Sequence, residues 1–195
     1  KFKFNETIIG LEHKDKRINK IISTKRNYNI DENEIVISTL PISITSRLLG
    51  KKNNLKIRGI CSVYLFYNQN YILPKNTHWL YFDSEDVIFN RITENKKLSK
   101  FVAPKNKSYL TAEITYSLND NFSKKSSQEV ISQVIKDISK VNLVNNQKLI
   151  DSQINYEPFV YPVQFMDYKS ETFAIKSFIE NFNNLYSVGA GGEFN

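Results

Sequence analysis

The glycines near the carboxyl end are the first residues whose type and spacing could do chemistry. Gly189, Gly191 and Gly192 are three of only six glycines in 195 residues, and they follow the short apolar stretch 185–188. Glycine reaches positive φ easily and lets backbone N–H groups approach a ligand closely. Successive N–H groups in such a turn can bind phosphate. The segment therefore predicts a short strand that runs into a ligand-binding glycine turn; a frayed glycine-rich tail is the alternative.

Arg91 and Glu113 are charged residues inside strand-like sequence. Arg91 could hold a carboxylate or a diphosphate bidentately, or it could form a surface ion pair with Glu94 or Asp86. Glu113 faces either solvent or a site. The sequence contains no Ser–His–Asp order, HExxH motif or pair of catalytic carboxylates. We therefore identify neither a catalytic residue nor a general base.

Aromatic residues next to Arg91 could form the floor of a ligand pocket. They are Trp79, Tyr81, Phe82 and Phe89. Aromatic side chains in strands also build hydrophobic cores, so both roles stay open.

The single cysteine limits redox and metal chemistry. Cys61 has no partner for an internal disulfide, which fits a reducing compartment, and we expect a cytoplasmic protein. One cysteine and two histidines exclude a Cys/His zinc site. Cys61 could pair with His13 or His78 as a nucleophile, but its apolar neighbours favour a position in the core.

The composition narrows the class of partner. The formal net charge is +7, but the lysines are scattered among polar turns, so nucleic acid is an unlikely partner. An anionic cofactor or substrate remains compatible with this charge. The sequence contains no run of eighteen apolar residues, so it predicts no membrane-spanning helix, and the first residues do not resemble a signal peptide.

The hydrophobic pattern predicts strands and helices that position these residues. Strands are expected at 7–12, 18–23, 34–39, 60–67, 77–83, 87–93, 109–118, 155–164 and 185–188. The run 34–39 is typical of a strand covered on both faces, and two prolines in 155–164 indicate an edge strand or an irregular one. A short helix is expected at 42–49.

Two longer amphipathic helices are expected. Ser126 and Glu129 form a capping box, and the apolar residues that follow have helical spacing. Ser170 is expected to cap the second helix, with Phe173 on its apolar side. The pattern predicts an α+β fold, an antiparallel sheet with two amphipathic helices, flanked at both ends by pieces that need a partner.

Several segments resemble, in the correct order, the flavin-containing amine oxidase and protoporphyrinogen oxidase superfamily. Two segments are similar to the superfamily as a whole: EIVISTLP at 34–41 and IRGICSVYL at 57–65. Four others are similar to its branch related to UDP-galactopyranose mutases: WLYFD at 79–83, FNRITE at 89–94, FVYPV at 159–163 and NLYSVGAGGEFN at 184–195.

The resemblance implies FAD as cofactor and a small-molecule substrate, anionic or a sugar nucleotide. It implies that 1–50 and 169–195 are partial pieces of an FAD-binding α/β domain and that 55–168 is an antiparallel substrate-binding domain. The implied cofactor contacts are Thr39, Pro41, Gly189, Gly191 and Gly192. The implied substrate contacts are Arg91, Trp79 and Tyr81.

The sequence also departs from the superfamily. Its GxGxxG unit is absent, so we expect that half to precede Lys1 and this chain to be an inactive fragment that ends before the helix facing the cofactor. Ala190 stands where the mutase branch has arginine. The main prediction is therefore an FAD-dependent oxidoreductase, with a mutase-like flavoenzyme and a non-enzymatic basic, aromatic binding module as alternatives. We also expect 34–49 to expose a surface through which two copies form a homodimer.

Overall fold

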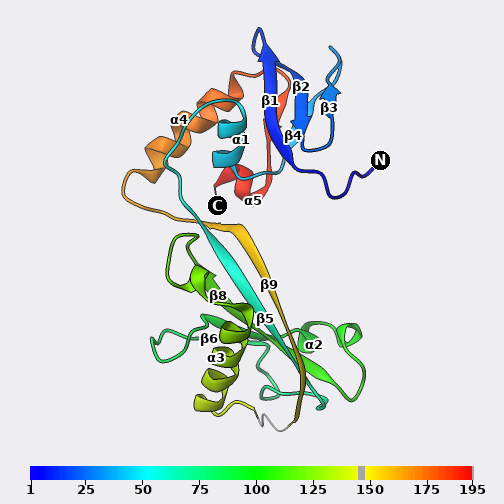
Figure 1. Ribbon diagram of the computed structural model, residues 1–195, viewed down its shortest axis with the longest axis vertical. Coiled ribbons are helices and arrows are strands. Elements are labelled where there is room, and N and C mark those ends of the chain that lie inside the picture. The colour runs from blue at the N-terminus through cyan, green and yellow to red at the C-terminus, as the bar shows by residue number, and fades with distance from the viewer. Residues whose placement is uncertain (145–147, 195) are drawn as a thin grey trace. The chain divides into compact units, whose positions relative to one another are not determined.

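The computed structural model describes residues 1–144 and 148–194, so Asn195, the last residue of the quoted closing segment, lies outside it. The chain forms two compact units (Figure 1). Unit 1 comprises Lys1–Ile57 and Tyr161–Asn195, and unit 2 comprises Arg58–Val160. Helices and antiparallel sheets occur together, which confirms the α+β class. The assignment of 1–50, 55–168 and 169–195 to cofactor and substrate domains stays a prediction.

Unit 2 is built on a five-stranded sheet of order β6-β7-β8-β5-β9. The strands are β5 (Ile57–Tyr67), β6 (Trp79–Tyr81), β7 (Arg91–Glu94), β8 (Ser108–Tyr116) and β9 (Leu149–Pro162). The pairs β6–β7, β7–β8 and β8–β5 are antiparallel. The prolines of β9 lie in an edge strand, as predicted, because proline cannot donate a ladder hydrogen bond.

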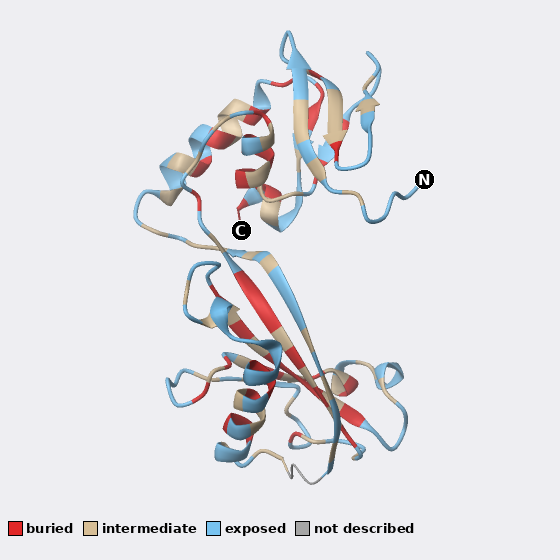
Figure 2. Ribbon diagram, viewed as in Figure 1, coloured by how far each residue is buried: buried red, intermediate tan, exposed pale blue. Residues whose placement is uncertain are grey.

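Helix α3 (Ser127–Lys140) packs on one face of this sheet. It begins with the predicted capping box: Ser126 Oγ accepts from Glu129 N–H at 3.3 Å, and Ser126 N–H donates to Glu129 Oε2 at 2.7 Å. Figure 2 shows the buried residues of β5 and α3 that form the core. Cys61 lies in this core, and burial raises the pKa of its thiol to about 11. This thiol is therefore a core group, not a ready nucleophile.

Unit 1 contains a three-stranded antiparallel sheet and a separate parallel pair. The sheet consists of β1 (Ile8–Lys14), β2 (Arg17–Ser23) and β3 (Asn27–Asn29), which confirms the predicted hairpin. The parallel pair is formed by β4 (Val36–Ser38) and β10 (Leu185–Ser187). The buried amide of Asn184, just before β10, joins this pair to β2: its Oδ1 accepts from Ile18 N–H at 2.8 Å, and its Nδ2 donates to Ile18 O at 3.0 Å.

The helices of unit 1 are α1 (Ile42–Leu48), α4 (Tyr168–Glu180) and α5 (Gly189–Glu193). Contacts of α1 and α4 with the strands build a second core around Ile18, Ile42, Ile175, Ile179 and Leu185. Among the described residues of unit 2 there are also the short helices α2 (Asn95–Leu98), η1 (Lys100–Val102) and η2 (Phe122–Lys124).

Several local predictions are wrong for identifiable reasons. Ser170 does not cap α4, because the helix begins earlier, at an N-cap Asp167 with φ 63°. Phe173 is 72% exposed, since the buried stripe of α4 follows Thr172, Ile175 and Ile179 instead. The 87–93 strand begins only at Arg91.

Two further corrections concern the parallel pair. The run 34–39 is not covered on both faces, because Val36 and Ser38 are buried while Ile37 is exposed. The glycines that follow β10 form the short helix α5, where a turn was expected. Strand β10 is therefore followed directly by a helix, α5.

Candidate functional site

The parallel pairing of β4 and β10 brings together residues that are about 150 positions apart. Leu185 pairs with Val36 and Ser187 with Ser38, and Val188 N–H donates to Ser38 O at 2.9 Å. The segment after β4 carries the predicted cofactor residues Thr39 and Pro41, and the segment after β10 carries the predicted glycines. Both segments therefore lie at the carboxyl edge of one parallel pair, where open α/β sheets bind ligands.

The three glycines have different structural roles. A Cβ on Gly192 would lie 2.9 Å from Ser187 Oγ, and a Cβ on Gly191 would lie 3.3 Å from Pro41 Cα. These two glycines allow α5 to pack closely against β10 and Pro41. Gly189 is different, because it has φ +84° and a Cβ added there would meet no atom within 4 Å. Its glycine requirement comes from the backbone conformation, and the space beside it is open to a ligand.

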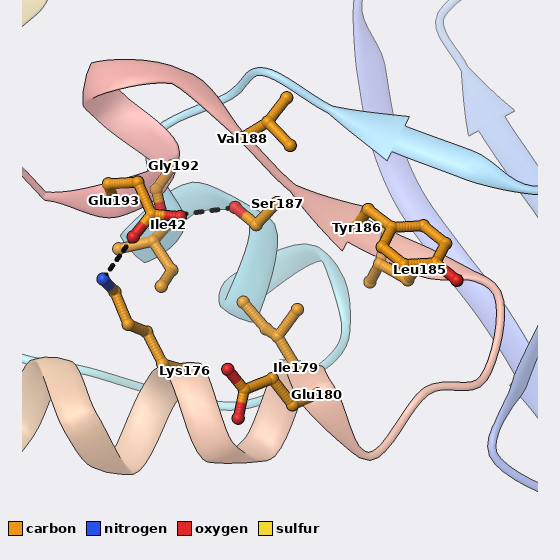
Figure 3. Close-up of a pocket in the computed structure, with 10 residues that line it drawn as sticks. All are labelled: Ile42, Lys176, Ile179, Glu180, Leu185, Tyr186, Ser187, Val188, Gly192 and Glu193. Carbon is orange, nitrogen blue, oxygen red and sulfur yellow. Dashed lines mark hydrogen bonds and ion pairs between the residues drawn. The ribbon is translucent and has the colours of Figure 1, made fainter.

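A pocket of about 280 Å³ lies between α4, β10 and α5 (Figure 3). Ile42, Ile179 and Leu185 form part of its apolar lining. Lys176 Nζ and Glu193 Oε2 are 2.5 Å apart, so these two charges are paired with each other. Ser187 Oγ donates to Gly192 O at 3.3 Å and ties the strand to the helix.

The residues at this edge fit part of an FAD site. The open backbone at Gly189 and the exposed Thr39 could accept the ribityl or pyrophosphate portion of the cofactor. Gly191 and Gly192 serve packing in the structure, so they could support the site without touching the cofactor.

A second candidate site lies on the sheet of unit 2. Strand side chains alternate between faces, and the residues between the core positions of β6, β7 and β8 point away from α3. They line a cavity of about 320 Å³ whose walls are Trp79, Tyr81, Arg91, Thr93, Asn95, Leu98, Thr111 and Glu113. All three residues predicted to bind substrate therefore line one cavity.

Cross-strand register explains how the polar residues meet. Tyr81 lies opposite Arg91, and Arg91 lies opposite Glu113. Arg91 Nε donates to Glu113 Oε2 at 2.5 Å, and Arg91 Nη1 donates to Tyr81 Oη at 3.2 Å. The hydrogen bond to Glu113 raises the pKa of Arg91 above its ordinary value, so Arg91 remains charged. The cavity consequently contains a cation whose charge is already balanced.

Arg91 forms an ion pair, one of its two predicted roles, but its partner is neither Glu94 nor Asp86. Glu94 is fully buried on the other face, where its carboxylate accepts from Leu73 N–H at 2.9 Å and from Ser108 Oγ at 2.6 Å. Glu113, weighed only as a solvent-facing or site residue, is the actual partner. The β7–β8 register was the missing information, because it cannot be deduced from either strand alone.

The aromatic residues divide between the site and the core. Trp79 and Tyr81 are exposed and line the cavity. Phe89 is buried, and Phe82 packs on it edge to face with ring centroids 4.9 Å apart. Two of the four aromatics therefore fit the pocket interpretation and two belong to the core.

Sequence reasoning missed the polar end of the cavity. Asn95 Nδ2 donates to Thr111 Oγ1 at 2.7 Å, and Thr93 lies opposite Thr111 across the β7–β8 ladder. The alternation of β8 places Thr111 on the same face as Glu113, which is the signal that could have identified it. The amide and hydroxyl groups of these residues can donate hydrogen bonds to a ligand's hydroxyl or carbonyl oxygens and accept them from its hydroxyl groups.

Residues 1–144 and 148–194 contain no group of three His, Cys, Asp or Glu residues placed to hold a metal ion. Within the same residues, no helix has both the length and the apolar character needed to cross a membrane.

Comparisons with known proteins agree on the fold. No family model matches the sequence, and no curated protein matches it. Among solved structures, reduced UDP-galactopyranose mutase has a TM-score of 0.75 at 17% identity, over 95% of this chain and 41% of that chain. A protein named as a protoporphyrinogen oxidase from Exiguobacterium sp. 255-15 has a TM-score of 0.72 at 14% identity, over 95% and 42%. An oxidoreductase from Methanosarcina mazei has a TM-score of 0.57 at 14% identity, over 95% and 44%.

This chain therefore spans less than half the length of each of these three structures, and over 95% of its own length it has the fold of UDP-galactopyranose mutase and of these oxidase-like proteins.

Proposed function

We propose that this chain is the substrate-binding part, with adjoining pieces of the cofactor domain, of a cytoplasmic FAD-dependent oxidoreductase. The observation that carries the proposal is the carboxyl edge of the paired strands β4 and β10, which are followed by Thr39 and Gly189, on a fold shared with UDP-galactopyranose mutase. The solved structures are more than twice as long, so the activity of the whole protein is part of the proposal.

Each unit would have its own task. In unit 1, the backbone around Gly189 and the hydroxyl of Thr39 would hold FAD, which supplies hydride acceptance when bound. In unit 2, Trp79 and Tyr81 would orient a substrate by ring contact, and Asn95 and Thr111 would bind its polar groups. No residue of this cavity is assigned as a general base.

The charge of the unit 2 cavity bears on the substrate class. Arg91 and Glu113 neutralise each other, and Trp79 and Tyr81 offer exposed rings beside them. A bare anion would meet the Glu113 carboxylate as well as the guanidinium. This arrangement favours an uncharged, polar, ring-containing ligand over the anionic substrate that the sequence suggested.

A mutase-like sugar-nucleotide enzyme is the second candidate, supported by the similarity to UDP-galactopyranose mutase and by the aromatic cavity. It requires Arg91 to bind a diphosphate. Titration with uridine diphosphate, followed by the fluorescence of the single tryptophan, Trp79, tests it directly. Binding that disappears in Arg91→Ala would support the mutase candidate, and no binding would count against it.

The third candidate is a non-enzymatic basic, aromatic module. The cavity-facing positions of β6, β7 and β8 carry Arg91 as their only basic residue, so this sheet face offers little to nucleic acid. Binding of nucleic acid by the isolated chain, with affinity that falls steeply with salt, would revive this candidate.

The absorption spectrum is the primary test of the flavoenzyme proposal. The protein would be purified together with its native flanking sequence and scanned for the two visible bands of oxidised flavin. We expect a yellow protein, and Gly189→Val should reduce its flavin content because a β-branched side chain at positive φ distorts this backbone. A folded, colourless protein that ignores added FAD would refute the proposal.

A further inference from the structure

The segment 95–107 of unit 2 presents apolar side chains to solvent. It contains α2, which is labelled in Figure 1, and η1, and it follows β7 in the sequence. Leu98 is 57%, Phe101 85% and Val102 46% exposed. Most of this segment is coloured as exposed in Figure 2. Single exposed apolar residues are common on proteins, but three within five residues at one tip form a cluster that indicates a contact surface.

A buried lysine holds this tip in place. Lys96 is 4% exposed, and its ammonium group donates to the backbone oxygens of Pro104 at 2.7 Å, Lys105 at 2.8 Å and Lys107 at 2.7 Å. It also donates to Asn70 Oδ1 at 2.9 Å. Burying an ammonium group is costly unless such acceptors surround it. Lys96 therefore holds the second half of the segment, 104–107, in place.

The neighbouring lysine fixes the other limb. Lys97 Nζ donates to Leu73 O at 2.7 Å and to Pro74 O, and it lies 3.8 Å from the buried carboxylate of Glu94. Because these hydrogen bonds hold both ends of the segment, its backbone is ordered and still leaves the side chain of Phe101 exposed.

The charges around the tip all have one sign. Residues 95–112 contain five lysines and no aspartate or glutamate. The ammonium groups of Lys96 and Lys97 are hydrogen-bonded within the protein. Lys100, Lys105 and Lys107 are exposed. The surface therefore combines a protruding aromatic and aliphatic tip with three exposed positive charges.

We propose that the segment 95–107 is a peripheral membrane-binding loop that inserts Phe101 and its apolar neighbours into the interface of an anionic lipid surface. Apolar side chains flanked by lysines bind such interfaces through both hydrophobic burial and attraction to acidic headgroups. A side chain as exposed as Phe101 protrudes, and a deformable lipid interface can accept it without a preformed groove. Leu98 also lines the unit 2 cavity, so the loop would bring that cavity close to the lipid surface.

Vesicle co-sedimentation of the 195-residue chain tests this proposal. The vesicles would consist of phosphatidylcholine alone or with about one third phosphatidylserine, a strongly anionic composition. We expect binding to the anionic vesicles, weakened roughly tenfold by Phe101→Ser because one aromatic side chain is no longer buried. Phe173→Ser is the matched control, since Phe173 is also a highly exposed phenylalanine but lies in unit 1.

A charge-matched pair of triple variants tests the electrostatic part. Changing Lys100, Lys105 and Lys107 to Gln should weaken binding by roughly fivefold for each lysine. The control variant changes the exposed Lys124, Lys125 and Lys136 to Gln, which alters the net charge equally within the same unit.

Each outcome has one meaning. Binding to anionic vesicles that the loop variants lose and the control variants keep would support the proposal. No binding, equal binding to both vesicle types, or binding that Phe101→Ser leaves unchanged would overturn it. Circular dichroism of the variants separates a lost surface from a lost fold. The test does not depend on FAD, so it can succeed or fail independently of the proposed enzyme.

Discussion

Replacing Glu113 by glutamine should convert the unit 2 cavity from a neutral site into an anion site. In the structure, Glu113 Oε2 lies 2.5 Å from Arg91 Nε and balances its charge. Glutamine keeps the shape and one oxygen acceptor but removes the negative charge. We therefore expect Glu113→Gln to bind pyrophosphate or uridine diphosphate more tightly than the unchanged protein does.

The magnitude follows from Coulomb's law. An anion on the outer edge of the Arg91 guanidinium would lie about 6 Å from the Glu113 carboxylate, and at an effective dielectric constant near 20 their repulsion is about 3 kcal/mol. The Glu113 side chain is 19% and the Arg91 side chain 30% exposed, so water and salt reduce this value. About half of it, ~1.4 kcal/mol, corresponds to a tenfold gain in affinity.

Trp79 supplies the assay, because it is the single tryptophan and it lines the cavity. Fluorescence titrations would compare the unchanged chain with Glu113→Gln and with Glu157→Gln, a control that removes an exposed carboxylate elsewhere in unit 2. Equal affinities in Glu113→Gln and in the control would show that Glu113 does not suppress anion binding at Arg91.

Three other predictions concern stability and association. Gly192→Ala should lower the free energy of unfolding by about 1–3 kcal/mol, because its Cβ would lie 3.2 Å from the backbone carbonyl carbon of Ser187 as well as 2.9 Å from Ser187 Oγ. A loss below about 0.5 kcal/mol in urea denaturation would contradict this. Burial raises the pKa of Asp137, but hydrogen bonds, first that from Lys140, outweigh it and bring the pKa below the ordinary value. The ionised carboxylate therefore stabilises the folded chain near neutral pH, and this stabilisation is lost as the pH falls through the folded-state pKa. Urea unfolding at neutral and acid pH should show a smaller acid-induced loss in Asp137→Asn than in the unchanged chain. In sedimentation velocity, the chain should self-associate through the exposed face of β4, and Ile37→Lys should remain monomeric; a monomeric unchanged chain at high concentration would contradict this.

Local patterns predicted the elements that depend on neighbouring residues. The capping box at Ser126 formed because both hydrogen bonds join residues three positions apart. The β1–β2 hairpin likewise depends on a short turn. In α4, by contrast, the start at Asp167 and the exposure of Phe173 depend on which face the rest of unit 1 covers. That information lies outside the local sequence.

The candidate sites show the same division. The sequence offered Arg91, Trp79 and Tyr81 as candidates because of their residue types and the resemblance of their segments to the superfamily, and the structure places all three in the lining of one cavity. It did not identify Glu113 as the partner of Arg91, because strand register is a tertiary property. The glycine segment was recognised, but its helical conformation depends on close packing against β10 and Pro41, which the sequence does not display.

The two candidate sites rest on different physical foundations, and this makes them separable in experiment. The carboxyl edge of β4 and β10, the candidate cofactor site, exists only while these strands pair, so any change that weakens unit 1, such as a side chain at Gly192, should affect it. The unit 2 cavity depends on alternation within one antiparallel sheet and is insensitive to that pairing. A Gly192 variant that loses flavin but still reports ligand through Trp79 fluorescence would therefore show that cofactor and substrate recognition reside in different units. Loss of both together would require a coupling that neither set of contacts contains.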